Sequence, residues 1–149
     1  SNEEGKKMID QYFARFPGIQ TYIKDTIDFA KKHGYVKTLF GRRRYIPDIH
    51  ARNWNVRSFA ERTAINMPIQ VTAADIIKMA MIRIQDHLKS NKLGTRMLLQ
   101  VHDELIFEVP EDELDGVSVT IKELMEQAFD LGLPLKVEMG WADTWLDAH

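Results

Sequence analysis

Hydrophobic positions in the first part of the chain recur at three- and four-residue steps. This spacing holds from residue 3 to residue 33 and predicts amphipathic helix. Pro17 interrupts the pattern, and a proline lacks a backbone donor and restricts the residue before it. We therefore expect a kinked helix or two abutting helices, ended by Gly34 after a run of basic residues.

Helical spacing returns after a short β-prone interval. Residues 35–46 contain two arms around Gly41, which predicts a hairpin whose tip carries Arg42 and Arg43. A long helical pattern then runs from about residue 55 to residue 88.

Pro68 lies inside this long pattern and removes one backbone donor, so we expect the helix to bend or to split in two. A further helix is predicted for residues 111–131, with acidic residues in its first turn. A last strand is expected at Leu135–Met139.

The most strand-like part of the chain, residues 96–109, has polar residues at its centre. His102, Asp103 and Glu104 lie between two apolar runs, which predicts a hairpin with a two-residue turn at His102 and Asp103. If strand alternation continues through the turn, Gln100, His102 and Glu104 share one face.

Together these elements predict a helix-rich α+β fold in which a small antiparallel sheet packs on long helices. We expect a helical segment over residues 3–95, with the basic hairpin at 35–46. A second segment over residues 96–149 holds the other hairpin, a helix and the last strand. There are no repeats and no linkers, so we treat both segments as one compact unit.

Composition agrees with a soluble globular protein. The chain has 149 residues, of which 44% are hydrophobic and 28% are charged, enough for one domain with its own core. It has no cysteine, which excludes disulfides and thiolate chemistry and indicates a cytoplasmic protein. No apolar run has the length of a membrane span and no secretory signal opens the sequence, so we expect no membrane association.

Charge is divided unevenly along the chain. Residues 31–62 hold nine basic and two acidic residues, a net charge of +7. Residues 100–149 hold thirteen acidic residues and two lysines, a net charge of −11. This asymmetry indicates a basic face for a polyanion, although charge runs are equally often ordinary solvated surface.

Asp103 is the first candidate for chemistry. A carboxylate on a rigid sheet turn is a good ligand for Mg²⁺, which takes one or two carboxylates and keeps several waters. His-Asp is a poor sequence for so tight a turn, which indicates a role beyond turn formation. A two-metal phosphoryl-transfer site needs carboxylates from different elements, and no other aspartate has a spacing that pairs it with Asp103. The alternative is a hairpin tip that simply faces solvent.

A second candidate set consists of polar residues four apart on the long helix, namely Arg62, Asn66 and Gln70. Such side chains suit hydrogen bonds to sugars and base edges in the minor groove, although spacing alone favours an ordinary solvent face. Arg42 and Arg43 suit phosphate contacts, but exposed arginines at turns are common.

Five stretches, in this order, resemble the C-terminal part of the polymerase domain of bacterial family A DNA polymerases, the DNA polymerase I group. They are "YFARFPGIQTYI", "GYVKTLFGRRRYIPDI", "AERTAINMPIQVTAADIIKMAM", "QVHDELIFEVP" and "TWLDAH". The resemblance spans residues 3–149 and implies part of the fingers and part of the palm. The fourth stretch is similar to the family's third polymerase motif, at a palm hairpin.

The resemblance implies a role for each candidate. Asp103 matches one of two aspartates that bind the catalytic Mg²⁺ ions, Glu104 an assisting acid, and His102 a neighbour of the primer terminus. The helix residues that match contacts to template and primer in the minor groove are Arg62, Asn66 and Gln70. Val71 departs from the glycine that family members usually have at this position.

The family's first motif, with the other metal-binding aspartate, and its nucleotide-binding fingers helix have no counterpart in this sequence. We therefore expect a fragment of a monomeric, DNA-templated DNA polymerase that adds dNTPs to a primer 3′-OH. Primer-template DNA and dNTP are the partners implied for the intact enzyme, in the bacterial cytoplasm at the nucleoid. The isolated chain is expected to be inactive and not to hold two Mg²⁺ ions stably. The alternative is a small non-catalytic DNA-binding module.

Overall fold

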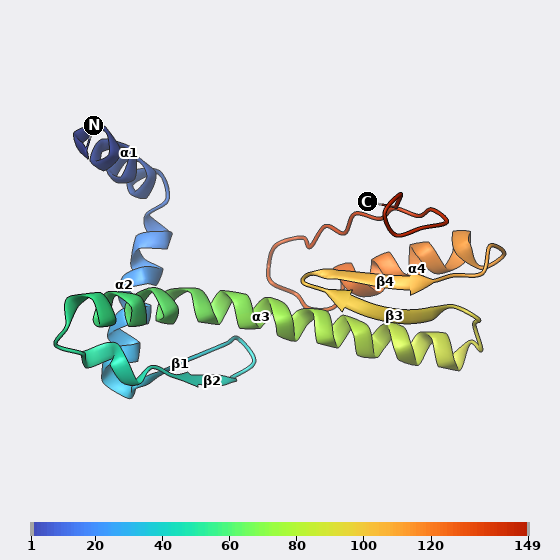
Figure 1. The fold of residues 1–149 in the computed structure, drawn as a ribbon, viewed down its shortest axis with the longest axis horizontal. Helices are drawn as coiled ribbons and strands as arrows, with labels where there is room; N and C mark the ends of the chain where they lie inside the picture. The colour runs from blue at the N-terminus through green and yellow to red at the C-terminus, as the bar shows by residue number, and fades with distance from the viewer. Residues whose placement is uncertain (1, 149) are drawn as a thin grey trace. The chain divides into compact units, whose positions relative to one another are not determined.

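The computed structural model describes residues 2–148 (Figure 1). The chain divides into two compact units, Ser1–Thr72 and Ala73–His149, which are called unit 1 and unit 2 below. Helix α3, Trp54–Ser90, contributes residues to both units.

Unit 1 begins with two helices that meet at Pro17. Helix α1 is Asn2–Arg15 and helix α2 is Pro17–His33, which confirms the predicted break. Phe16 between them has φ −126° and ψ 67°, outside the helical region, as expected before a proline. Helix α2 ends at Gly34 in a left-handed conformation with φ 74°, where glycine carries no steric cost.

The predicted basic hairpin is present but its strands are short. Strands β1, Tyr35–Lys37, and β2, Arg43–Tyr45, pair in an antiparallel manner, and the 3₁₀ turn η1, Pro47–His50, follows. The prediction that both Arg42 and Arg43 lie at the tip is wrong for Arg43, which belongs to β2 and pairs with Lys37.

The core of unit 1 lies between this hairpin, η1, α2 and the first part of α3 (Figure 1). The α3 side of this core is made largely of small side chains, which let the other elements approach the helix closely. Val71 is half-buried and packs against the buried set, which is Ala30, Val36, Ile46, Ile49, Ala60, Ala64 and Met67.

Helix α3 runs through Pro68 without a break, so of the two expected outcomes, a bend or a split, the split does not occur. A proline at this position leaves the carbonyl oxygen of Ala64 without its usual helical donor. The neighbouring carbonyl oxygen, of Ile65, accepts a hydrogen bond from the Tyr22 hydroxyl at 2.8 Å. Ala64 and Met67 are buried on the core side, and this packing keeps the helix continuous although the proline opposes it.

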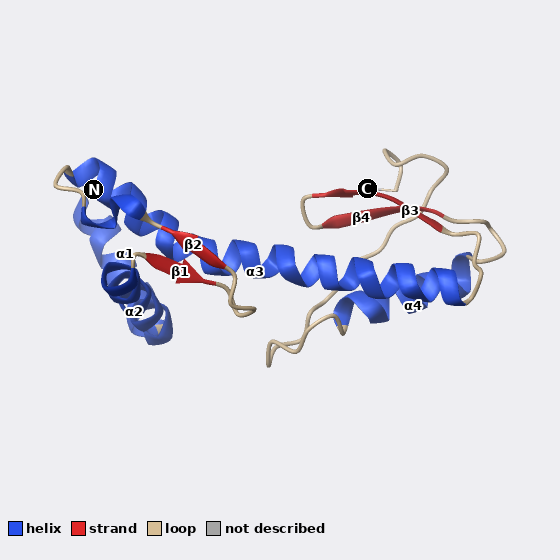
Figure 2. Ribbon diagram, turned by 90° about the horizontal axis from the view of Figure 1, so that it is seen from below, coloured by secondary structure: helices blue, strands red, loops and turns tan. Residues whose placement is uncertain are grey.

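Unit 2 places a hairpin against two helices (Figure 2). Strands β3, Arg96–Val101, and β4, Glu104–Glu108, are antiparallel, and helix α4 is Leu114–Glu126. The register shifts between Met97 and Leu99, so Leu98 is an extra residue that forms a bulge in β3. The buried residues of this core are Ile84, Leu88, Val117 and Ile121, and the hairpin residues packed against them include Met97, Leu105 and Phe107.

Two expectations for the end of the chain are wrong. Helix α4 is shorter than the predicted residues 111–131. At its start, the acidic residues 111–113 form a turn instead of helix. At its C-terminal end, the carbonyl oxygen of Gln127 accepts a hydrogen bond from the Arg83 guanidinium at 2.6 Å. Leu135–Met139 is not a strand. A β-prone segment needs a partner strand, whereas the backbone N–H of Val137 donates to the Glu126 carboxylate at 3.0 Å.

The predicted helix-rich α+β class is confirmed, with two separate two-stranded antiparallel sheets in the described residues. Among the helices of residues 2–148, none combines the length and the apolar composition needed to cross a membrane.

Candidate functional site

The turn of the β3–β4 hairpin carries the predicted polar triplet. Val101 pairs with Glu104, which leaves His102 and Asp103 as a two-residue turn, as predicted. His102 has φ 53°, a left-handed conformation that costs a non-glycine residue about 1–2 kcal/mol. The Gln100 side-chain amide donates a hydrogen bond to the carbonyl oxygen of His102 at 2.8 Å and holds the turn in this shape.

The predicted division of faces around this turn is wrong. Gln100 pairs with Leu105, and Val101 pairs with Glu104, so each of these pairs shares a face of the sheet. Strand alternation does not continue through a two-residue turn, because the chain reverses there.

The hairpin behind this turn is held firmly on its helices. Leu105 and Phe107 of β4 and Met97 of β3 pack against the core of unit 2. At the far end of the hairpin, Arg96 and Glu108 form an ion pair at 2.6 Å, which contributes little because both side chains are largely exposed. The exposed carboxylate of Asp103 therefore projects from the end of a packed hairpin.

The Glu113 carboxylate ties the start of β3 to the start of α4. It accepts hydrogen bonds from the Thr95 hydroxyl at 2.6 Å, the Gly94 N–H at 2.6 Å and the Thr95 N–H at 2.9 Å. These donors favour the charged form of the carboxylate and lower the pKa of Glu113 below its usual value. The Thr95 hydroxyl has the largest effect, and the Gly94 N–H has the next largest.

The turn is suited to hold part of a metal site. Mg²⁺ binds through one or two protein carboxylates together with waters and substrate phosphates, and adjacent carboxylates of Asp103 and Glu104 can supply the protein share. Within residues 2–148, however, no three histidine or acidic side chains gather as a metal-binding group. The donor set fits a shared site that needs a further carboxylate.

The polar trio of α3 lies in unit 1, on a different unit from the turn. Arg62, Asn66 and Gln70 are all exposed, and the buried residues Ala60 and Ala64 lie on another side of the helix. The Arg62 guanidinium also donates a hydrogen bond to the hydroxyl of Ser58, one turn earlier in α3, at 2.9 Å. Ser58 is half-buried, whereas Arg62 is exposed.

The trio therefore forms an exposed polar face of α3 that is accessible to a ligand. Gln70 stays exposed on a regular helix next to Val71, whose side chain turns to the core of unit 1. Valine in place of glycine thus adds packing on the core side, and it does not break the helix at Gln70.

The basic hairpin supplies two further cations. Arg42 and Arg43 are exposed, and the Arg43 guanidinium lies 4.8 Å from the centre of the Tyr35 ring. Sequence reasoning identified the arginines but missed this ring contact. Tyr35 and Arg43 both belong to the two short arms around Gly41, but their contact depends on the strand register, which the residue pattern does not give.

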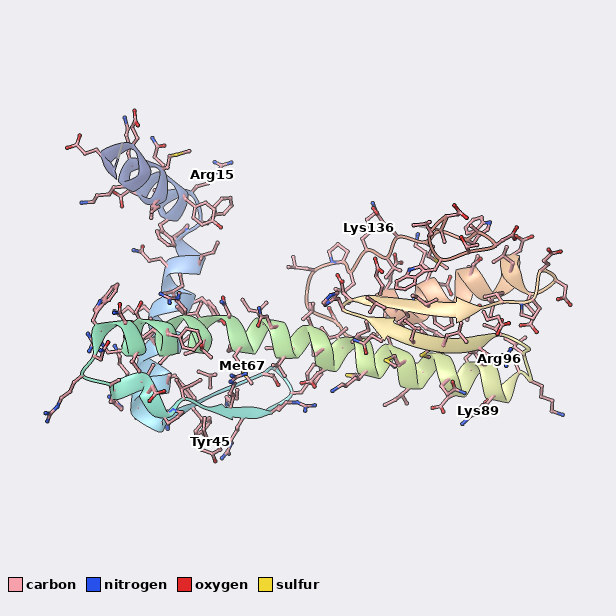
Figure 3. All side chains as sticks on the ribbon, viewed as in Figure 1. Arg15, Tyr45, Met67, Lys89, Arg96 and Lys136 are labelled. Atoms are coloured by element: carbon pink, nitrogen blue, oxygen red, sulfur yellow. The ribbon has the colours of Figure 1, made fainter. Side chains whose placement is uncertain are left out.

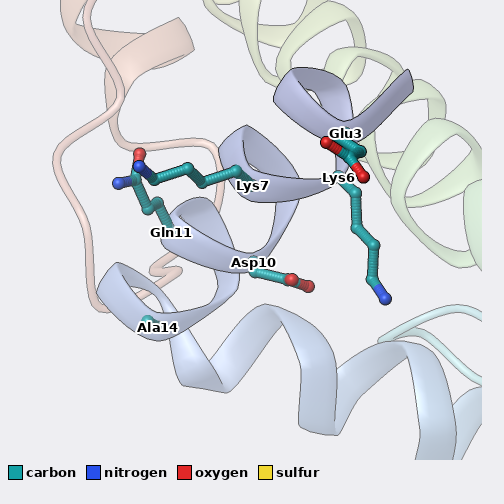
Figure 4. Close-up of a pocket in the computed structure, with 6 residues that line it drawn as sticks. All are labelled: Glu3, Lys6, Lys7, Asp10, Gln11 and Ala14. Carbon is teal, nitrogen blue, oxygen red and sulfur yellow. The ribbon is translucent and has the colours of Figure 1, made fainter. Parts of the chain in front are cut away.

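Gln100 was also missed as a residue that supports the turn, and its position two residues before the turn residue His102 is the signal that could have found it. A hollow along α1 contains none of the candidate residues (Figure 4). It is lined from a single helix, so no groups converge on a ligand from different elements. Its residues are Glu3, Lys6, Lys7, Asp10, Gln11 and Ala14.

Comparison with known proteins gives the family directly. The sequence profile of DNA polymerase family A matches residues 1–147. The chain is 52% identical over 148 residues to DNA polymerase I of Geobacillus stearothermophilus, an alignment that covers 99% of this chain and 17% of that protein. It is 50% identical to DNA polymerase I of Bacillus subtilis, with the same coverage of 99% and 17%.

A solved structure agrees. The POL domain of Pol1 from M. smegmatis, in complex with DNA primer-template and dNTP, matches with a TM-score of 0.95 and 47% sequence identity. The match covers 99% of this chain and 26% of that one, and the chain spans 17% of the length of its curated relatives. The resemblance in the sequence is confirmed, and the chain belongs to DNA polymerase family A.

Proposed function

We propose that this chain is part of a DNA-directed DNA polymerase, a nucleotidyltransferase that extends a primer 3′-OH with dNTPs. The observation that carries the proposal is the carboxylate of Asp103, which projects from the two-residue turn of a packed hairpin. Catalysis by positioned charge needs groups that do not reorganise during the reaction, and a turn mounted on a core meets that need.

Asp103 is the proposed metal ligand, with Glu104 as the assisting acid and His102 beside the primer terminus. The implied cofactor is Mg²⁺, which in two-metal phosphoryl transfer stabilises charge on the attacking and leaving oxygens. The second carboxylate and the nucleotide-binding residues are proposed to come from polymerase sequence outside this chain.

Arg62, Asn66 and Gln70 are the proposed contacts to primer and template in the minor groove. Their exposed positions on one helix favour this role, because donors on a rigid face can reach acceptors that all base pairs present. Arg42 and Arg43 are the proposed phosphate contacts, which position DNA without reading its sequence.

The proposed partners of the intact enzyme are primer-template DNA and dNTP. The support is the solved relative with 47% identity, whose own complex contains DNA primer-template and dNTP. We place the enzyme in the bacterial cytoplasm at the nucleoid, acting as a monomer, and the bacterial origin of the relatives supports this location.

The test is the variant Asp103→Asn in the full-length polymerase that contains this chain. We expect kcat for primer extension to fall at least about 100-fold, because a fixed charge at the reacting phosphate is lost, while Kd for primer-template DNA stays within about twofold. Asp112→Asn, at an exposed acidic turn, is the matched control and should keep normal turnover.

Near-normal turnover of Asp103→Asn would remove this residue from the metal site. If the full-length protein binds primer-template DNA but never extends a primer, the alternative of a non-catalytic DNA-binding module holds instead. Gln70→Ala tests the polar trio of α3 separately from the turn that carries Asp103. This variant should raise Kd for primer-template DNA, and unchanged binding would exclude the minor-groove role of Gln70.

A further inference from the structure

A second surface of unit 1 combines aromatic rings with cations, and we propose that it binds an unpaired DNA strand. Strands β1 and β2 and the end of α2 build this surface, which we call the aromatic–basic face. Its residues are Phe29, His33, Tyr35, Lys37, Arg43 and Tyr45.

The rings of this face form a continuous series. The ring centres of Phe29 and His33 are 4.4 Å apart, those of Phe29 and Tyr35 are 5.6 Å apart, and those of Tyr35 and Tyr45 are 5.8 Å apart. The last two contacts are edge-to-face, an arrangement that aromatic pairs prefer. The series fixes the orientation of Tyr45, the outermost ring, before any ligand arrives.

Two cations lie over the same rings. The Lys37 ammonium is 5.8 Å from the centre of the Phe29 ring, and the Arg43 guanidinium is 4.8 Å from the centre of the Tyr35 ring. Lys37 and Arg43 are also direct cross-strand partners, so they lie on the same face of the hairpin.

Like charges directly opposite each other destabilise a strand pair. Across residues 2–148, no carboxylate forms an ion pair with Lys37 or Arg43 that would offset this repulsion. A phosphate group placed between the two cations would offset it. The face is therefore built for an anion, and the arginine guanidinium suits a phosphate in particular.

The exposed ring of Tyr45 indicates that the ligand is a strand with unpaired bases. Its side chain is 69% exposed and lies on the side of the hairpin away from α3 (Figure 3). An exposed, oriented ring can stack with a base only if that base is not already stacked inside a duplex. A phosphate between Lys37 and Arg43, with a base on Tyr45, matches the way aromatic and basic residues together bind single strands.

This proposal rests on the proposed polymerase function only for the identity of the strand. Template-directed synthesis requires a template that is unpaired ahead of the primer end, and this unpaired segment is the strand we assign to the aromatic–basic face. Binding of a single strand as such depends on the contacts of this face alone.

Fluorescence anisotropy on the full 149-residue chain tests the proposal. The labelled probes are dT12, an abasic 12-mer that has the same sugar-phosphate backbone without bases, and a 12-base-pair duplex. Tyr45→Ala should raise Kd for dT12 about tenfold, because stacking of one base on an aromatic side chain is lost. Tyr45→Phe keeps the ring and should remain within about twofold of the wild type. Arg43→Gln should make the salt dependence of dT12 binding shallower by about one phosphate, whereas Lys6→Gln, on α1, should not.

The proposal is overturned if the wild-type chain does not bind dT12, or if the abasic 12-mer binds as tightly as dT12. It is also overturned if Tyr45→Ala changes nothing, or if Tyr45→Phe weakens binding as much as Tyr45→Ala while circular dichroism shows both variants folded. Primer extension by the full-length polymerase and its Asp103→Asn variant tests the polymerase function separately. A failure of one proposal therefore does not count as a failure of the other.

Discussion

His102 shows how one residue gives up stability to shape a candidate site. Its φ of 53° suits glycine, yet the position holds a histidine, which directly precedes Asp103 and whose carbonyl oxygen accepts a hydrogen bond from the Gln100 side-chain amide. Strained backbone of this kind persists where the surrounding structure determines it, and it often accompanies function.

Removing this strain gives a prediction at the residue scale. His102→Gly should raise the free energy of unfolding of the 149-residue chain by about 0.5–1 kcal/mol, because glycine adopts positive φ without a steric penalty. Urea denaturation monitored by circular dichroism measures the change. Asp103→Gly, the matched control in the same turn, should give no gain, since Asp103 does not have a positive φ. A loss of stability in His102→Gly would contradict the strain argument.

At the scale of elements, the Glu113 carboxylate joins the start of β3 to the start of α4 through three hydrogen bonds. The pKa of Glu113 is lowered in the folded chain, so its contribution to stability is fully present above the ordinary glutamate pKa of about 4.3. That contribution is lost as pH falls through the lowered pKa.

Glu113→Gln should therefore flatten the loss of stability below about pH 4.3, and it should reduce stability at pH 7. The measurement is the free energy of unfolding from urea titrations between pH 3 and pH 7. Glu111→Gln, two residues earlier in the same exposed turn, is the control and should keep the wild-type profile. Identical profiles for Glu113→Gln and the wild type would show that the carboxylate does not join these elements.

Element by element, the sequence predicted most where the physics is local. Pro17, Gly34 and the two-residue turn at His102 have short-range causes, and all three were found from the residue pattern. The continuity of α3 through Pro68 depends on packing of Ala64 and Met67 against segments distant in sequence, which no local pattern contains. The last strand failed for the same reason, because a strand exists only with a partner.

At the scale of the whole molecule, the chain carries only part of the proposed reaction site. We expect no primer extension by the 149-residue chain alone with Mg²⁺ and all four dNTPs, because the described residues contain no three-ligand metal cluster. A gel assay with a labelled primer measures this, with the full-length polymerase as positive control. Robust extension by the chain alone would contradict the proposal of a shared metal site.

The candidate residues were predictable from sequence only to a limited extent. Spacing put Arg62, Asn66 and Gln70 on one helix, but the exposure of all three became visible only in the fold. The series of rings at Tyr35 and Tyr45 was not predictable, because it depends on a strand register and on the end of a helix.

The extra residue in β3 has a consequence for changes in chain length. Leu98 interrupts the two-residue alternation of side chains along β3. Met97 and Gln100 are an odd number of positions apart, yet their partners Phe107 and Leu105 share one face of β4, so Met97 and Gln100 share a face as well. Deleting this leucine would remove the bulge and keep the pairing, because Met97, Leu99 and Gln100 would then be consecutive residues opposite Phe107, Ile106 and Leu105. This half-exposed residue is therefore a position in β3 where the loss of a single codon leaves the inward and outward faces of the hairpin unchanged.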